Sequence, residues 1–234
     1  MIPIRDDTPR FSTPYITYFI IALNVVVFLF ELSVGAQSHR ALNGLMYQFG
    51  VVPLHFERAL AGTSNTSLPA VSLTILTSMF LHASWLHIIG NMWFLWIFGD
   101  NIEDYLGHFS YLMFYLVSGF AAMATHILLN AGSNVPALGA SGAIAGVMGG
   151  YFVLYPRARV MMWFPPIFFF YLPAWLVLGY WFLTQFLSGA VTSIAGSGAT
   201  GGIAVWAHVG GFVAGIVLIK LLPERRGRNR YAAW

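Results

Sequence analysis

Two residues in this sequence are suited to nucleophilic chemistry, a serine and a histidine that lie in separate glycine-rich segments. Ser141 belongs to the segment GASG at 139–142, and His208 belongs to AHVGG at 207–211. A serine hydroxyl becomes a nucleophile when a histidine within hydrogen-bonding distance removes its proton. Because the chain has no cysteine and no acidic residue between positions 105 and 223, we expect a Ser-His pair without an aspartate.

Further polar residues lie in the second apolar stretch and beside Ser141. His87 and Asn91 are four positions apart, so on a helix they lie about 40° apart and can address one ligand atom. Gly139 permits a turn with close backbone approach, and Ser141 would then lie near a helix N-terminus, where backbone N–H groups favour developing negative charge. The segment is not the G-x-S-x-G turn of soluble hydrolases, because position 143 is alanine. A serine between glycines in a membrane helix is more often a packing device.

His82 precedes His87 by five residues. If one helix carried both, His82 would be rotated by about 140° from His87. The glutamate of the zinc motif H-E-x-x-H is also absent. We therefore expect no zinc site from this pair and no other metal or cofactor.

The composition excludes a water-soluble globule. Hydrophobic residues make up 58% of the 234 positions, charged residues only 8%, and the mean hydropathy is +0.73. So much apolar surface must face lipid. The formal charge of +3 arises mostly from a short C-terminal tail, which indicates membrane topology and argues against a nucleic-acid partner.

Six apolar stretches are long enough to cross a hydrocarbon core of roughly 30 Å as helices. They lie near residues 15–32, 73–98, 109–129, 140–155, 167–187 and 203–222. We therefore predict an all-α, polytopic bundle of six transmembrane helices. The fifth could begin as late as Pro173, with residues 168–170 at the interface, because Pro165, Pro166 and Pro173 each break or start a helix.

The basic residues predict the orientation. Nine fall on one side (Arg5, Arg10, Arg157, Arg159, Lys220, Arg225, Arg226, Arg228 and Arg230) and two on the other (Arg40 and Arg58). By the positive-inside rule, residues 1–14 form a cytoplasmic segment, 15–222 the membrane domain and 223–234 a basic cytoplasmic tail. Alternatively, the first stretch is a signal peptide cleaved after Ala36. Residues 33–72 are expected to form a partly buried interfacial hairpin, and residues 188–202 a mobile connection.

Small residues mark one face of two predicted helices: Ser141, Ala145 and Gly149 on the fourth, and His208, Gly211 and Gly215 on the sixth. Such faces allow helices to pack backbone to backbone. This packing would bring Ser141 and His208 into hydrogen-bonding range. Because the second, fourth and sixth spans run in the same direction, their polar residues can meet in one cavity that opens to the outer side.

On these motifs the sequence resembles the rhomboid family of intramembrane serine proteases. The resemblance covers the six-span core and depends on H-x-x-x-x-H-x-x-x-N at 82–91, G-x-S-G at 139–142 and A-H-x-x-G at 207–211. It implies that Ser141 is the nucleophile and His208 the general base. It also implies that His87, Asn91 and the Ser141 N–H form the oxyanion hole.

The resemblance also implies supporting roles. These fall to His82 in the outer loop, to Gly139, Gly142, Gly211 and Gly215, and to Glu103 and Gly107 as scaffold positions. The sequence departs from the family at Ala145, where an aromatic residue often stacks on the base, and Trp206 or another aromatic could substitute. The Trp-Arg pair of the first outer loop is also missing, with residues 56–58 the nearest approach.

The implied partners are the lipid bilayer and transmembrane-protein substrates, cut where small or helix-breaking residues unwind the helix. The oligomeric state is left open. Short tails favour a prokaryotic plasma membrane. The main alternative is an inactive rhomboid-like protein that binds membrane proteins or serves their quality control. A channel or transporter is disfavoured by the missing acidic residues and by the absence of an inverted repeat.

Overall fold

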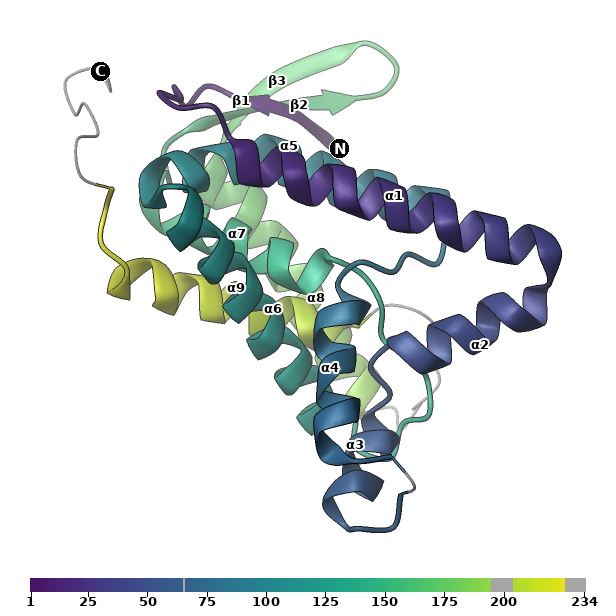
Figure 1. The fold of residues 1–234 in the computed structure, drawn as a ribbon. Coiled ribbons are helices and arrows are strands. Elements are labelled where there is room, and N and C mark those ends of the chain that lie inside the picture. Colours follow the sequence, from purple (N-terminus) through teal and green to yellow (C-terminus); the bar gives the residue numbers. More distant parts are fainter. Residues whose placement is uncertain (65, 195–203, 226–234) are drawn as a thin grey trace.

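The computed structural model describes residues 1–64, 66–194 and 204–225, and most of these are helical (Figure 1). In chain order the elements are β1 (Ile2–Asp6), α1 (Tyr15–Gln37), α2 (His39–Phe49), α3 (Pro53–Leu60), α4 (Leu68–Ser78), α5 (Trp85–Leu106), α6 (His108–Leu129), α7 (Ser141–Leu154), β2 (Arg159–Phe164), β3 (Phe168–Pro173), α8 (Ala174–Ile194) and α9 (Val205–Leu221).

The predicted all-α membrane bundle is confirmed. Helices α1, α5, α6, α7, α8 and α9 correspond to the six predicted spans. Of these, α1, α6 and α8 are long and apolar enough to cross a membrane, whereas α7 and α9 are apolar but shorter. The shortness of α7 matters for the site described below.

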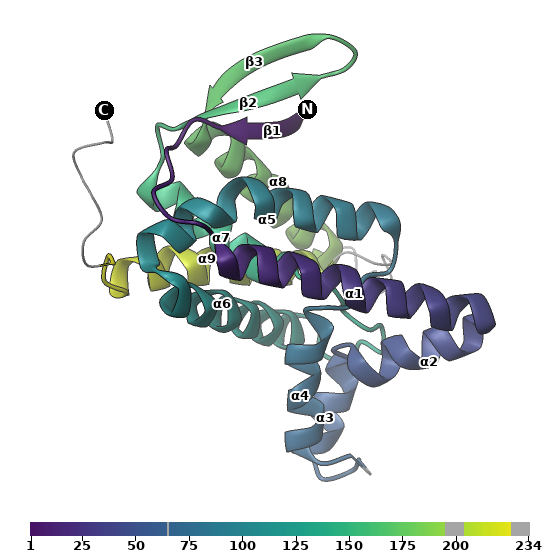
Figure 2. The same ribbon diagram turned by 45° about the horizontal axis from the view of Figure 1, so that its top comes forward.

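Helix α7 lies at the centre of the bundle, between α5, α6 and α9 (Figure 2). Every residue from Gly142 to Tyr151 is buried. Glycines make this possible, because a Cβ on Gly211 or Gly215 of α9 would overlap the carbonyl oxygen of Gly142 or Gly146 on α7. The predicted small-residue contact therefore forms. On α7 it is made by Gly142 and Gly146 in addition to the predicted Gly149, where a Cβ would overlap the carbonyl oxygen of Phe212.

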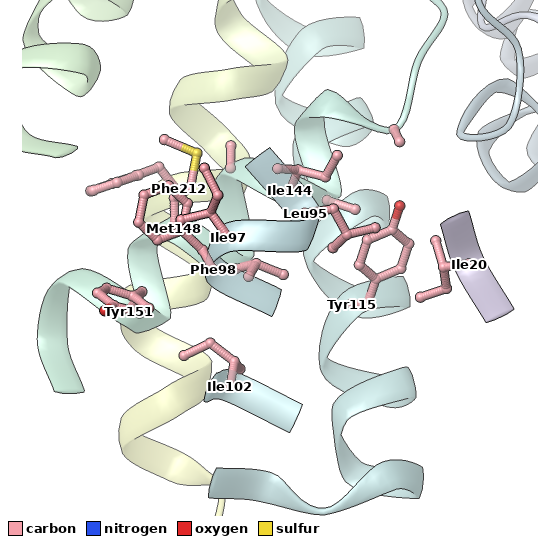
Figure 3. Close-up of a cluster of buried hydrophobic side chains, with 14 of the residues drawn as sticks. Ile20, Leu95, Ile97, Phe98, Ile102, Tyr115, Ile144, Met148, Tyr151 and Phe212 are labelled. Atoms are coloured by element: carbon pink, nitrogen blue, oxygen red, sulfur yellow. The ribbon is translucent and has the colours of Figure 1, made fainter. Parts of the chain in front are cut away.

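Large apolar side chains fill the space around α7 (Figure 3). The cluster includes Ile20, Leu95, Phe98, Ile102, Tyr115, Ile144, Met148, Tyr151 and Phe212, contributed by α1, α5, α6, α7 and α9. In a membrane this contact stabilises the bundle through van der Waals packing, because lipid tails are as apolar as the core itself. Since α1 supplies core residues, it is an integral helix of the bundle.

A buried carboxylate joins α5 to the start of α1. The carboxylate of Glu103 accepts hydrogen bonds from the backbone N–H groups of Ile16 (2.9 Å) and Thr17 (2.8 Å) and from the Thr17 hydroxyl (2.7 Å). His108 Nδ1 donates to the same group at 2.6 Å. The first N–H groups of a helix have no partner within it, and a negative charge there is favourable. Gly107, with φ +78°, makes the turn between Glu103 and His108.

The prediction of one helix over residues 73–98 is wrong. Helix α4 ends at Ser78, and α5 begins at Trp85 and continues to Leu106. Ser84 caps α5 by accepting the N–H of His87 at 3.2 Å. The carboxylate of Glu31 on α1 accepts the N–H of His82 at 3.1 Å and so stabilises the intervening turn. An apolar pattern does not reveal such a break.

The fifth predicted span begins later than residue 167. Residues 159–173 form the antiparallel hairpin of β2 and β3, and α8 starts directly after Pro173. The later of the two predicted starts is therefore confirmed. β1 adds to the hairpin as a third strand, with Ile2 opposite Trp163. The sheet contacts both α5 and α8, and Trp93 of α5 donates its indole N–H to the carbonyl of Pro3 at 2.6 Å.

The interfacial hairpin expected over residues 33–72 is also wrong, because α1 extends to Gln37 and is followed by α2 and α3. Both short helices are amphipathic; α2 buries Met46, and α3 buries Pro53 and Phe56. An isolated β-bridge between Val51 and Ala137 links this region to the segment before α7.

Of the connection expected at 188–202, residues 188–194 belong to α8, and the remainder lies outside the described residues. The start of the sixth span at 203, and Arg226, Arg228 and Arg230 of the predicted tail, also lie outside them.

Candidate active site

Ser141 and His208 meet where α7 and α9 begin. Ser141 is the first residue of α7, and His208 lies in the first turn of α9. The Nε2 atom of His208 is 2.8 Å from the Oγ atom of Ser141. The backbone contact between Gly142 and Gly211 holds the two helices close at this point. The geometry suits proton transfer from the hydroxyl to the imidazole.

A side chain of α8 completes the surroundings of His208. The Oε1 atom of Gln185 lies 2.7 Å from His208 Nδ1. Gln185 is not among the residues expected from the sequence motifs. The sequence does mark this position, because an uncharged polar residue inside an apolar span is a candidate functional residue, as an ionisable one is.

The aromatic neighbour of the histidine is Trp181. Its ring centroid is 5.6 Å from that of His208. Trp206, considered from sequence, instead packs on Phe186 and donates its indole N–H to Ser193. Trp181 and Gln185 are one helical turn apart on α8, so one face of this helix supplies both contacts. Spacing along α7 could not reveal an aromatic residue that comes from another helix.

Two nitrogen atoms converge beside the serine at the glycine turn. Gly139 has φ +114°, which confirms the predicted turn. A Cβ on this residue would lie 2.7 Å from His87 Nε2 and 3.4 Å from Asn91 Nδ2. The two side chains therefore approach the backbone two residues before Ser141, whose own N–H belongs to the first turn of α7. The arrangement places several donors around one small volume.

The position of His82 differs from the helical expectation. It lies in the turn before α5, and its ring is 5.0 Å from that of His87 rather than rotated away. The amide Nδ2 of Asn91 donates to His82 Nε2 at 2.9 Å. Since Nε2 accepts, His82 carries its proton on Nδ1, which faces the carbonyl of Phe80 at 3.3 Å. His82 thus fixes the orientation of the Asn91 amide.

The Ser141–His208 pair faces a cavity of about 220 Å³ between α5 and α8. Its walls include Phe94, Ile144, Met148 and Trp181, and its polar side chains are His87, Asn91, Ser141 and His208. Helix α7 has 14 residues, which gives a rise of about 21 Å against a hydrocarbon core of roughly 30 Å. A helix this short can hold Ser141 below one membrane surface. Among the described residues, no group of three or more His, Cys, Asp or Glu side chains could hold a metal ion.

Comparison with known proteins gives one family. Residues 70–225, which include all the residues of this candidate site, match the model described as Rhomboid domain. The chain is 29% identical over 201 residues to "Presenilin-associated rhomboid-like protein, mitochondrial" of Rattus norvegicus, covering 81% of this chain and 49% of that protein.

Two other relatives bear similar names. "Rhomboid protein 1, mitochondrial" of Saccharomyces cerevisiae is 29% identical over 69% of this chain and 46% of its own length. "Rhomboid-like protein 11, chloroplastic" of Arabidopsis thaliana is 30% identical over 63% and 51%. The chain spans about half the length of the curated relatives it matches.

Proposed function

Since this chain belongs to the rhomboid family, as the match over residues 70–225 establishes, we propose that it is an intramembrane serine protease. It hydrolyses peptide bonds in or near the transmembrane helices of other membrane proteins. The observation that carries the proposal is the 2.8 Å separation between Ser141 Oγ and His208 Nε2. It is supported by the cavity, which gives a substrate carbonyl access to this pair.

The reaction proceeds in two halves. Ser141 Oγ attacks the scissile carbonyl while His208 Nε2 takes the hydroxyl proton, and the resulting imidazolium protonates the departing amine. A water molecule then attacks the acyl-enzyme, with His208 again accepting a proton. The second product leaves as a carboxylic acid, and the Ser141 hydroxyl is restored.

The tetrahedral intermediate carries a negative oxygen that needs donors. His87, Asn91 and the Ser141 N–H supply them in this proposal. Each donor of this kind stabilises the transition state by roughly 2.7 to 4 kcal/mol. Their convergence on Gly139 supports the assignment, because the glycine leaves open the volume that a side chain would fill.

The substrate must present an unwound backbone. An intact helix in lipid hides its carbonyls in internal hydrogen bonds. Small or helix-breaking residues near the scissile bond would let the segment extend into the cavity. We expect such residues to determine which transmembrane helices are cut.

The proposal includes a prokaryotic plasma membrane with both chain ends in the cytoplasm and the cavity open to the outer side. The distribution of Lys and Arg supports this orientation. The relatives described above carry mitochondrial or chloroplastic names.

Because the chain has no cysteine, single-cysteine variants test the orientation directly. An impermeant maleimide added to intact cells should label Ser38→Cys and not Arg157→Cys.

The activity is tested in liposomes with a fluorogenic transmembrane substrate. Wild-type protein should cleave it, while Ser141→Ala and His208→Ala should be inactive but folded. Equal cleavage by all three would overturn the Ser-His assignment. If wild-type protein neither cleaves nor reacts with a fluorophosphonate, yet binds transmembrane helices unchanged by Ser141→Ala, it is a rhomboid-like binding protein.

A further inference from the structure

We propose that Gln185 is a positioning residue that holds the His208 imidazole in the tautomer needed to deprotonate Ser141. The inference rests on the proposed function for its catalytic meaning. Its structural part, the tautomer of His208, can be measured without any turnover.

The two nitrogen atoms of the His208 ring have different partners. A neutral imidazole carries one proton, so one nitrogen donates and the other accepts. The Oε1 atom of Gln185 can only accept, and at 2.7 Å it therefore places the proton on His208 Nδ1. Nε2 is left as the acceptor, and it is this atom that lies 2.8 Å from Ser141 Oγ. Without Gln185, either nitrogen could carry the proton.

In soluble serine hydrolases a carboxylate usually performs this task. Here no acidic residue lies between positions 105 and 223. An unpaired carboxylate is costly in a membrane interior, whereas a neutral amide can accept a hydrogen bond at a lower desolvation cost. Gln185 thus orients the ring without a second charge. The expected contribution is to orientation rather than to stabilising the imidazolium.

The setting of Gln185 favours a fixed geometry. Trp181, one turn earlier on α8, packs against the His208 ring and also against Phe212, one turn later on α9. Phe182 stacks on the same Phe212 ring at 4.7 Å. These contacts lock α8 against α9 beside the hydrogen bond. The part of α8 that carries Gln185 is therefore held beside α9.

The chain offers a matched control on the same helix. Thr184 is adjacent to Gln185, and its hydroxyl donates to the carbonyl of Trp181 at 2.7 Å within α8. Replacing it removes one polar contact of α8 and leaves the Gln185 amide in place. Thr184→Ala should therefore leave the tautomer and the turnover unchanged.

The experiment compares wild type, Gln185→Leu, Gln185→Glu and Thr184→Ala in liposomes. Histidines are labelled with ¹⁵N, and spectra are recorded above about pH 8, where an ordinary histidine is neutral. The His208 signals are those lost in His208→Ala. Wild type should show a protonated Nδ1 and a bare Nε2. Gln185→Leu should show a mixture of tautomers, and Gln185→Glu, which keeps an acceptor, should restore the wild-type pattern.

The kinetic expectation follows from the tautomer. Gln185→Leu should lower kcat by about 10-fold or more with little change in KM, since general-base catalysis is typically worth 10² to 10⁴ in rate. Gln185→Glu should recover most of kcat. An unchanged tautomer together with an unchanged kcat in Gln185→Leu would overturn the proposal. If Gln185→Leu does not fold, Gln185→Asn, one methylene too short to reach His208, is judged by the same two measurements.

Failure of the proposed function is distinguishable. If wild type neither cleaves the substrate nor reacts with a fluorophosphonate, the protease assignment fails. The ¹⁵N spectra would still decide whether Gln185 sets the tautomer of His208.

Discussion

Gly215 of α9 lies directly against the carbonyl oxygen of Gly146 of α7, with no room for a methyl group between them. One turn closer to the active site, Gly211 makes the same contact with Gly142. The distance between Ser141 and His208 is therefore set by two pairs of glycines below them. Stability and the geometry of the Ser-His pair should change together when these glycines are replaced.

Replacing Gly215 by alanine should separate α7 from α9. Overpacking of this kind typically costs about 1 to 3 kcal/mol. We expect a lower free energy of unfolding in an SDS titration and slower labelling of Ser141 by a fluorophosphonate. Gly44→Ala in α2 is the control, because among the described residues its Cβ would meet no atom within 4 Å. If the two variants behave alike, the glycine contact does not set the helix separation.

Removing the Asn91 amide should slow catalysis without unfolding the protein. Asn91→Ala deletes one proposed oxyanion donor, and kcat should fall by roughly 10² to 10³. The cleavage rate in liposomes measures this loss. Asn130→Ala removes the same amide at the end of α6, where it contacts His126 of its own helix. A similar loss in both variants would argue against a donor role for Asn91.

His82→Leu should weaken catalysis through Asn91. The substitution removes the acceptor that orients the Asn91 amide at 2.9 Å. Because the amide remains but loses its fixed orientation, we expect a smaller loss of kcat than for Asn91→Ala. In a double-mutant cycle the two effects should be non-additive. Additive effects would mean that His82 acts independently of Asn91.

Glu103→Ala should destabilise the junction of α1 and α5. It leaves the N–H groups of Ile16 and Thr17 without their acceptor. A hydrogen bond to a charged group contributes about 1.5 to 3 kcal/mol, so the free energy of unfolding should fall by at least this amount. Glu103→Gln, which keeps one carbonyl acceptor, should lose less. Thr17→Val should cost less in the Glu103→Ala background than in wild type, because the hydroxyl then retains only its longer hydrogen bond to Tyr111, at 3.3 Å.

Much of the fold could be predicted from hydropathy alone. Long apolar runs identified the six helices, and the glycine spacing on α9 identified the face that contacts α7. The motif residues Ser141, His208, His87 and Asn91 line one cavity. Such features are local in sequence or follow from helical periodicity, which is why one sequence suffices to find them.

Other features depend on contacts between distant segments. The break before α5 depends on the carboxylate of Glu31, 51 residues away from His82. The sheet depends on pairing between β1 and β2, which are far apart in the sequence, so no local pattern predicts it. The polar character of Gln185 within an apolar span is visible in the sequence, but its partner, His208, lies 23 positions later and is not. Each of these is decided by tertiary structure rather than by propensity.

The pairing of Ile2 with Trp163 has a consequence for the order of folding. During synthesis, β1 is made well before β2 and has no partner strand until the chain has been made beyond α7. Closing so long a loop is entropically slow, and contacts of high sequence separation form late. We therefore expect Ile2–Asp6, although made before the central helices, to reach their native positions after them. The sheet would then close the fold only after the central helices have assembled in the bilayer.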